Sequence, residues 1–288
     1  MLIRSRGEKT FEVFNIFIMI LLGMVTLFPL IHIASKSLSD EAYVLARDIV
    51  LFPKGLQFEA YRNIIGNARF ARSFQNTIIL TFVGTSINVM MTVITAYPLS
   101  RKRFPGQSAI MVFYVFTMFF SGGIIPSYLL MRDLKLLDSM WSLILPGTIN
   151  VYNMILIKNF FMSVPDSLEE SAKIDGCKQI RILFSIFFPL SLPAISTITL
   201  FYAVGHWNSY FAALMYLNSR NKYPLQLFLR EMLIEETVDV VDISNLLDVA
   251  PDSVKAATII VATVPILVIY PFLQKYFVKG VMIGAIKE

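Results

Sequence analysis

Charge and cysteine are scarce in this chain of 288 residues. Only 16 % of the residues are charged, whereas soluble globular domains carry roughly 25 %. Hydrophobic residues reach 56 %, and a mean hydropathy of +0.65 leaves too few polar side chains to cover a soluble surface. The single cysteine excludes a disulfide framework. We therefore expect a membrane protein.

Motifs for catalysis and for metal or nucleotide binding are also missing. The chain has two histidines and lacks H-E-x-x-H, G-x-S-x-G and paired cysteines, so we expect no catalytic residue and no metal site. It lacks G-x-x-x-x-G-K-[ST] and cannot hold nucleotide phosphates by that route. The formal net charge of +5 suits cytoplasmic lysines and arginines of a membrane protein, so it does not indicate nucleic acid.

Long charge-free segments dominate what is present. A helix needs about 20 mostly apolar residues to cross roughly 30 Å of hydrocarbon, and segments on this scale occur six times. We predict an all-α, polytopic integral membrane protein with six transmembrane helices in one domain, residues 1–288. The predicted spans are 13–35, 76–98, 108–130, 139–159, 192–217 and 255–277.

The fifth charge-free segment, residues 182–219, is too long for one helix across a bilayer. Pro189 and Pro193 divide it. We expect 182–188 to lie at the membrane surface and 192–217 to span it. The alternative is two spans joined by a hairpin, which would place the two termini on opposite sides of the membrane.

Basic residues near short loops indicate orientation. Arg101, Lys102 and Arg103 fill the tight connection after the second span without any acid, which is typical of a cytoplasmic loop. Both termini are then cytoplasmic. Arg62, Arg69 and Arg72 fall in an external segment and oppose this assignment.

A short charged segment at 163–190 does not belong in lipid. Ser167 and Glu170 have the spacing of a capping box, which predicts a helix start. Gly176 falls where a left-handed residue would end that helix. A second helix is predicted from Gln179, with an apolar side formed by Ile180, Leu183, Phe184 and Phe187. Docking to another protein and a loop helix without a partner both fit this pattern.

The same segment resembles the EAA loop of permease subunits in type I ABC importers, whose pattern is E-A-A, three residues, G, nine residues, I-x-L-P. Here Glu170-Ser171-Ala172 precedes Gly176 by the same interval, and Ile186 to Pro189 follow at the same distance. Ser171 and Phe188 depart from the pattern. Segments 121–128, 207–211 and 274–281 resemble the carbohydrate-uptake, MalG-like branch, most closely the LplC/YtcP-type permeases for complex sugars.

The resemblance implies the type I ABC importer fold in a bacterial cell membrane. It implies that the EAA helix is a coupling helix, formed here by Glu170, Ser171, Ala172, Asp175 and Gly176. It also implies a homologous partner permease, an extracytoplasmic sugar-binding protein, and two ATPase subunits that hold ATP and Mg, with no cofactor in this chain. External segments 36–72 and 220–255 are expected to contact the sugar-binding protein.

Polar and aromatic residues inside the spans are candidates for an oligosaccharide pathway, because aromatic faces stack on sugars and amides bond to hydroxyls. The main candidates are Asn153, His206, Trp207, Asn208 and Tyr210; Asn76, Asn88 and Asn150 are further ones. Asparagines also join helices by hydrogen bonds, which is the structural alternative. An ion-coupled transporter of a small polar solute is the rival function, although the charge-free segments hold no ionisable relay of acids and bases.

Overall fold

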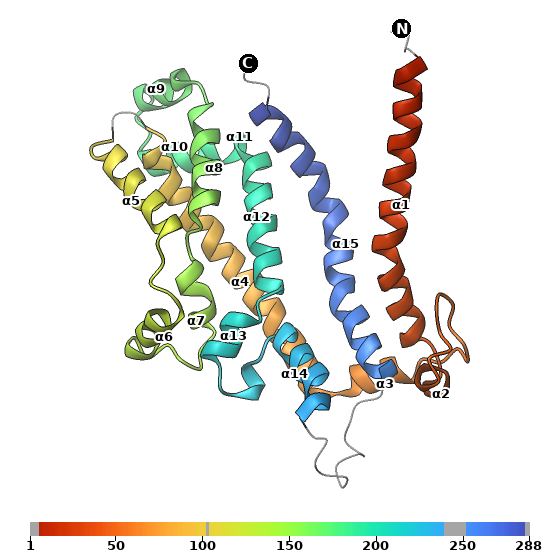
Figure 1. Ribbon diagram of the computed structural model, residues 1–288. Helices are drawn as coiled ribbons and strands as arrows, with labels where there is room; N and C mark the ends of the chain where they lie inside the picture. The colour runs from red at the N-terminus through yellow and green to blue at the C-terminus, as the bar shows by residue number, and fades with distance from the viewer. Residues whose placement is uncertain (1–5, 102–103, 239–251, 286–288) are drawn as a thin grey trace. The chain divides into compact units, whose positions relative to one another are not determined.

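The computed structural model describes residues 6–101, 104–238 and 252–285, and every regular element in these ranges is helical (Figure 1). The predicted basic pair Lys102 and Arg103, and residues 239–251 of the second external segment, lie outside the described residues. The elements are α1 Arg6–Ser37, α2 Glu41–Leu45, α3 Glu59–Gly66, α4 Ala68–Leu99, α5 Gln107–Phe119, α6 Ile124–Asp133, α7 Trp141–Ile144, η1 Leu145–Gly147, α8 Val151–Met162, α9 Asp166–Ile174, α10 Gln179–Ile182, η2 Leu183–Phe187, α11 Phe188–Leu190, α12 Leu192–Trp207, α13 Phe211–Tyr216, η3 Arg220–Lys222, α14 Leu225–Val238 and α15 Asp252–Ala285.

The chain forms two compact units. One comprises Met1–Ala68 and Leu229–Val264, and the other comprises Arg69–Phe228 and Pro265–Glu288. The boundaries fall within α14 and α15, so each of these helices contributes to both units.

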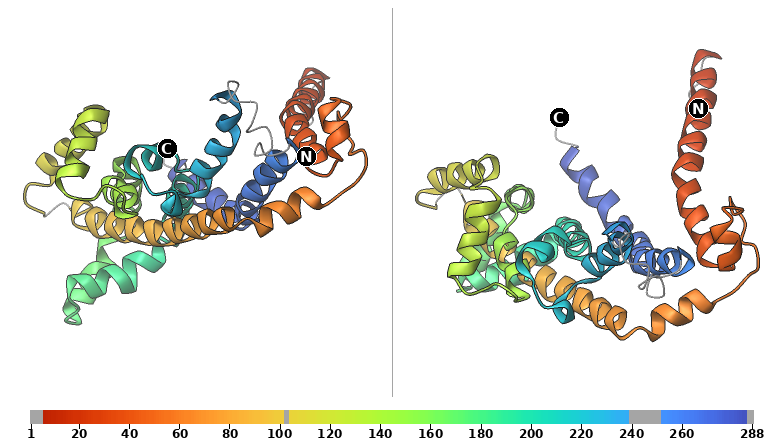
Figure 2. Two further views of the ribbon diagram at one scale, coloured as in Figure 1. Left: turned by 90° about the horizontal axis from the view of Figure 1, so that it is seen from below. Right: turned by 60° about the horizontal axis from the view of Figure 1, so that its bottom comes forward.

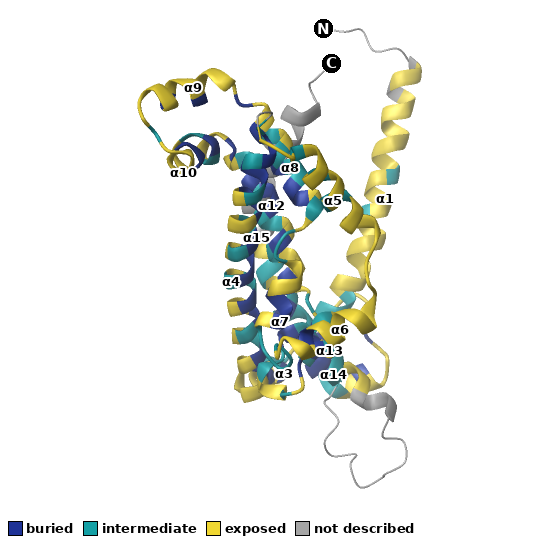
Figure 3. Ribbon diagram, turned by 90° about the vertical axis from the view of Figure 1, so that its left-hand side faces the viewer, coloured by how far each residue is buried: buried dark blue, intermediate teal, exposed yellow. Residues whose placement is uncertain are grey.

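In the first unit, α1 is apolar on all sides. A window of 18 residues within Thr10–Ser37 has a mean hydropathy of 2.5 and none of that window is buried, and most of α1 is accordingly yellow in Figure 3. A helix that is apolar all round suits a membrane. Polar contacts gather where α1 ends: Lys36 pairs with Asp252 at 3.0 Å, and the Glu41 carboxylate accepts hydrogen bonds from the amides of Asp252 and Ser253 at the start of α15.

The second unit is built along α4, which Figure 2 shows as one continuous helix, in orange. Its two ends contribute to two different hydrophobic clusters. At the C-terminal end, Tyr97 and Leu99 pack with residues from α8, α9, η2 and α12, including Phe161, Ala172 and Phe187. Toward the N-terminal end, the second cluster comprises Leu80, Met131, Leu143, Ile144, Ala213, Tyr216, Leu217 and Leu227.

Three predicted spans are not continuous helices. Residues 108–130 form α5 and α6, which meet at 113°; the break contains Gly123 with φ of +87°, a conformation that favours glycine. Residues 139–159 form α7, η1 and α8 around Pro146, and residues 192–217 form α12 and α13. The bend of 86° before α12 falls between Pro189 and Pro193, where the sequence predicts a division.

By length and composition, two helices of the described chain can cross a membrane, or four if each bent pair counts as one span. Breaks inside a membrane are tolerated where neighbouring helices satisfy the freed backbone groups. The six-span count therefore stays a prediction.

Candidate functional site

Helix α9 begins without the predicted capping box. The structure places Pro165 at the N-cap, with no side-chain cap hydrogen bond, and Ser167 lies inside the helix. The capping box was wrong because Pro165 starts the helix before Ser167 can act as the cap. Asp166 and Glu169 fall in the first turn, where negative charge is favourable next to the free amides of a helix N-terminus.

Gly176 ends α9 as predicted. Its φ is +77°, which L side chains rarely adopt. The Cys177 amide donates to the Ala172 carbonyl at 2.9 Å, and the Gly176 amide donates to the Lys173 carbonyl at 3.0 Å. These two bonds form a Schellman motif, which fixes the direction in which the chain leaves the helix.

Most of α9 faces outward. Glu169 and Ala172 are its only buried residues, and Figure 3 shows the rest of the helix in yellow. Of the predicted coupling residues, Ala172 packs into the core, whereas Glu170, Ser171, Asp175 and Gly176 are exposed. Ile174 is 87 % exposed, so an apolar side chain is available to a partner beside the charged ones.

A group of interactions around Arg101, called here the Arg101 cluster, holds α9 from the inner side. It consists of Arg101, Glu169, Lys173, Phe161 and Phe187. Arg101 Nη1 pairs with Glu169 Oε2 at 2.8 Å, and Lys173 Nζ pairs with Glu169 Oε1 at 2.6 Å. Arg101 Nη2 donates to the Phe161 carbonyl at 2.8 Å in the last turn of α8, where carbonyls lack helical partners.

Aromatic rings lie beneath the guanidinium. The Arg101 Cζ atom lies 4.4 Å from the centroid of the Phe187 ring and 5.6 Å from that of Tyr97, within the range of cation–π attraction. Tyr97, Phe161 and Phe187 meet one another edge to face. Phe187 belongs to η2, a single π-helical turn, so the arrangement depends on that local departure from α-helix.

The electrostatics of Glu169 combine two opposing effects. Burial alone would raise the pKa of this carboxyl group. The ion pairs with Lys173 and Arg101 outweigh burial, and the pKa is lowered below its usual value. Glu169 is therefore charged at neutral pH and acts as an acceptor for both cations.

A cavity of about 820 Å³ adjoins this cluster. Its polar wall includes Arg101, Glu169 and Gln179, and its apolar wall includes Ile94, Ile180 and Phe184. Ile180, Leu183 and Phe184 therefore line the cavity, and Leu183 is also buried. Phe187 does not line the cavity and lies in the core. The apolar side chains that were predicted to share one side of this helix thus face both the cavity and the core, because the π-helical turn changes the residue spacing.

The predicted pathway residues do not form one group. His206 and Trp207 are buried at the end of α12, whereas Asn208 and Tyr210 are exposed and Asn153 is buried in α8. Trp207 meets Phe74 edge to face at 6.0 Å. His206 lies against Gly84, where an added Cβ would come within 2.5 Å of His206 Nε2. Asn208 donates back to the Val204 carbonyl and closes the end of α12.

Three further asparagines make structural bonds. Asn76 donates to the carbonyls of Asn221 and Tyr223, and Asn88 donates to the Gly147 carbonyl. The Asn150 side chain accepts from the Asn153 amide and caps α8. These contacts follow the structural alternative, in which membrane asparagines join elements.

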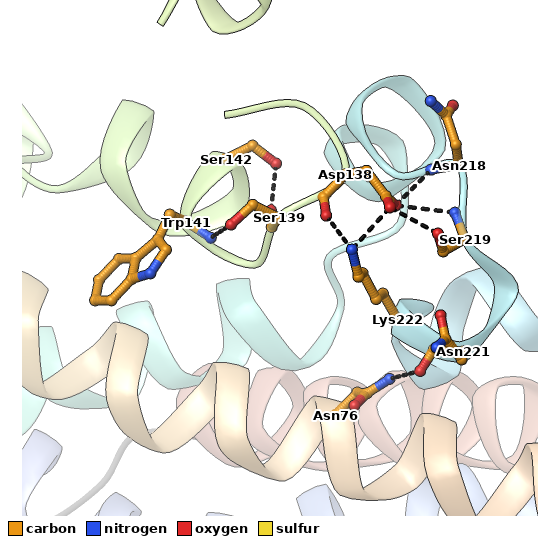
Figure 4. A network of polar contacts seen from close by, with 9 residues as sticks. All are labelled: Asn76, Asp138, Ser139, Trp141, Ser142, Asn218, Ser219, Asn221 and Lys222. Carbon is orange, nitrogen blue, oxygen red and sulfur yellow. Dashed lines mark hydrogen bonds and ion pairs between the residues drawn. The ribbon is translucent and has the colours of Figure 1, made fainter. Parts of the chain in front are cut away.

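Another polar group, the Asp138 cluster, is drawn in Figure 4. It lies beside α6, α7 and α13, at the end of the second unit opposite to α9 (Figure 1). It consists of Asp138, Asn218, Ser219 and Lys222. Asp138 Oδ1 accepts from the amides of Asn218 and Ser219, and Oδ2 accepts from Ser219 Oγ and Lys222 Nζ. The hydrogen bonds from Lys222 and Ser219 hold the pKa of Asp138 far below its ordinary value. The cluster joins the α6–α7 connection to the segment after α13.

The sequence alone missed the central residues of both clusters. Glu169 precedes Lys173 by four residues, a spacing that favours an ion pair on a helix, and this was the one available signal. Arg101 and Asp138 find partners 68 and 84 residues away in the chain, which spacing cannot reveal. Within the described residues, no three histidine, cysteine or acidic side chains are grouped to hold a metal ion.

Comparison with known proteins identifies the class. Residues 88–283 match the family of binding-protein-dependent transport system inner membrane components, and the chain belongs to this family. It therefore has the type I ABC permease fold and is a membrane protein of a transport system.

Individual relatives match nearly the whole chain. It is 42 % identical over 98 % of its length to Protein LplC of Bacillus subtilis, covering 97 % of that protein. It is 41 % identical over 97 % of its length to the polygalacturonan/rhamnogalacturonan transport system permease protein YtcP of the same species, covering 99 % of it. A chain from the crystal structure of a bacterial ABC transporter involved in the import of the acidic polysaccharide alginate superposes with a TM-score of 0.89 at 34 % identity, covering 96 % of this chain and all of that one.

Proposed function

We propose that this chain is the permease subunit of an ATP-driven importer for an oligosaccharide or polysaccharide fragment. The observation that carries the proposal is identity above 40 % along almost the full length to permeases that include one for polygalacturonan and rhamnogalacturonan. The exposed, rigidly ended helix α9 supports it, since a subunit driven by another protein needs an accessible docking element.

The proposed assembly contains a homologous partner permease, two ATPase subunits and an extracytoplasmic sugar-binding protein. ATP and Mg are held by the ATPase subunits. The exposed residues Glu170, Ser171, Asp175 and Gly176, with Ile174 beside them, form the docking side of α9. The chain lies in a bacterial cell membrane with both termini in the cytoplasm, and a reporter fused to the C-terminus tests this orientation.

In the proposed mechanism, closure of the ATPase dimer displaces α9. Because α9 contacts the end of α4 and the last turn of α8 through the Arg101 cluster, its displacement moves these helices. The pathway then opens outward, and the binding protein delivers the sugar. His206, Trp207, Asn208, Tyr210 and Asn153 are the proposed contacts for sugar in this chain.

The function is tested by uptake in proteoliposomes that contain the full complex. The probes are digests of polygalacturonan, rhamnogalacturonan and alginate, each loaded on the binding protein. We expect import of at least one digest that requires ATP and survives an ionophore with ATP held constant. Import that collapses with the ionophore, or no import of any digest, would contradict the proposal.

Trp207→Ala tests the sugar pathway separately. Loss of transport with an intact complex and intact basal ATP hydrolysis would support sugar contact. Equal loss of assembly would assign Trp207 to packing against Phe74 instead. Phe74→Ala is the matched control, because it removes the same ring contact from the other side.

A further inference from the structure

Arg101 is the point where four segments of the second unit meet. Its Nε donates to Ser100 Oγ directly after α4, Nη1 pairs with Glu169 of α9, and Nη2 donates to the Phe161 carbonyl of α8. Its charged plane lies over the Phe187 ring of η2. Each nitrogen of the guanidinium thus has a partner in a fixed direction, as the rigid geometry of arginine favours.

Helix α9 has few other attachments to the unit. Only Glu169 and Ala172 of its nine residues are buried, and alanine offers a single methyl group to the core. Leu168 and Ile174 are exposed, so apolar burial does not fix the rotation of the helix. The pair between Glu169 and Arg101 is the contact that sets this rotation, since the side chains are 8 % and 15 % exposed, respectively.

The receiving side is rigid. Tyr97 lies in the last turn of α4 and Arg101 follows two residues after its end, and Tyr97 donates from its hydroxyl to Gln179 Oε1 of α10 at 2.8 Å. Tyr97 also packs on Phe161 and Phe187. A displacement applied to α9 therefore meets a closely packed group that includes the end of α4.

We propose that Arg101 is a positioning residue for energy coupling, which makes α9 and α4 move as one body through its pair with Glu169. The proposal rests on the proposed function, because it assumes that a partner drives α9. It adds that the connection runs through Arg101 and the buried Glu169, with the exposed Asp166 as a second partner of Arg101 at 3.5 Å, and not through the exposed residues of the EAA pattern.

The primary experiment measures the distance between α9 and α4 directly. Spin labels are placed at Ser167→Cys on α9 and Ser86→Cys on α4, both exposed positions, in a Cys177→Ala background of the full complex. If the two helices move as one body, the wild-type distance distribution is narrow and does not change when ATP is added. In Arg101→Gln and in Glu169→Gln we expect a broader distribution that shifts with ATP.

Two control variants and one conservative variant complete the experiment. Lys173→Gln removes the other partner of Glu169. The Lys173 side chain is 44 % exposed, so this variant should leave the distance distribution narrow. Arg132→Gln removes an exposed pair with Asp133 in α6 and should change nothing. Arg101→Lys keeps the charge but not the three directed contacts, so it should restore part of the wild-type behaviour.

A second readout is the amount of sugar imported per ATP hydrolysed, with a rhamnogalacturonan digest as the probe. In Arg101→Gln it should fall by between about twofold and 30-fold, the range for residues on such coupling paths, while assembly persists. The double variant Arg101→Gln/Glu169→Gln should lose less than the sum of the two single losses, because both substitutions remove the same pair.

Several outcomes would overturn the proposal. The first is a distance between α9 and α4 that changes with ATP in the wild type. The second is a distance distribution in Arg101→Gln and Glu169→Gln that is as narrow as in the wild type. The third is an amount of sugar imported per ATP that is the same in Arg101→Gln as in the wild type. The distance measurement needs no sugar, so failure to import the digests would count against the proposed function and leave the distance result to decide the role of Arg101.

Discussion

The Arg101 cluster and the Asp138 cluster lie at the two ends of the second unit and differ in the interactions that hold them together. Each joins segments distant in the chain through an acidic side chain and a basic one. At the Arg101 cluster the paired side chains are 15 % and 8 % exposed and aromatic rings lie beneath the cation. At the Asp138 cluster the lysine is 41 % exposed, and the acid accepts hydrogen bonds from two backbone amides as well as from Ser219 Oγ and Lys222 Nζ. Burial makes the first dependent on both charges, whereas the second can lose one bond and keep the others.

Glu169→Gln should have the largest effect on stability. Removing one partner of a buried ion pair costs about 3–5 kcal/mol. We expect the lower end, because Arg101 keeps its pair with Asp166 at 3.5 Å and because Lys173, which also loses its partner, is half exposed. The free energy of unfolding in mixed detergent micelles measures this. A loss equal to that of Asp138→Asn would remove the proposed difference between the two ends.

Gly84→Ala should have the next largest effect on stability. The added Cβ would lie 2.5 Å from His206 Nε2, and overpacking of this kind costs about 1–3 kcal/mol. His206→Ala removes the obstructing ring, so the double variant Gly84→Ala/His206→Ala should recover part of the loss. Thermal unfolding of the detergent-solubilised chain measures the effect. No recovery in the double variant would show that the close approach of α4 and α12 is not the cause.

Asp138→Asn should cost about 1 kcal/mol. Hydrogen bonds to a charged group contribute about 1.5–3 kcal/mol, but Lys222 is partly exposed and solvent weakens its pair. Asparagine retains an oxygen for the backbone amides, so the cluster loses charge and keeps part of its bonding. Unfolding by detergent measures the change, with Arg132→Gln as a control expected to show no effect.

Gly176→Ala should cost about 1 kcal/mol through backbone strain, since φ is +77° and no atom lies near the added Cβ. The strain acts where α9 ends, so the variant should also weaken stimulation of the ATPase subunits in the complex. Gly106→Ala, at a positive φ with the same free space, is the matched control. An equal loss of ATPase stimulation in both variants would show that backbone strain anywhere in the chain has this effect, and that the end of α9 has no special role in coupling.

Acidification should disrupt the two clusters at different pH values. Both acids have a lowered pKa in the folded chain, so their contribution to stability is full above the ordinary pKa and is lost as pH falls through the folded pKa. The pKa of Asp138 is displaced further, so the Arg101 cluster should fail first on acidification. Fluorescence of Trp141 reports on the Asp138 end in a Trp207→Phe background, and a fluorine label on Cys177 reports on the other. Simultaneous transitions would contradict this order.

The sequence predicted the elements whose signals are local. The Gly176 stop, the helix start at Gln179 and the break between Pro189 and Pro193 depend on residues within a few positions, and the structure has all three. The capping box failed by local competition, because Pro165 already begins α9.

Features that depend on packing between distant segments could not be predicted. Absence of charge locates apolar segments but does not reveal breaks such as the one between α12 and α13. The burial of Glu169 instead of Glu170 depends on where Arg101 lies in space. Asn76 and Asn88 were candidates for sugar contact with helix contacts as the alternative, and their carbonyl partners lie outside the reach of sequence spacing.

The π-helical turn Leu183–Phe187 has a consequence for how this region tolerates insertions and deletions. A π-turn accommodates one more residue than an α-turn, so deleting one residue there would restore ordinary helix and leave the side chains before and after the turn in nearly the same orientation. Phe187 could then stay under Arg101 while Gln179 keeps its hydrogen bond with Tyr97. This turn should therefore tolerate a single-codon deletion better than the α-helical turns beside it, where a deletion rotates the two sides by about 100° relative to each other.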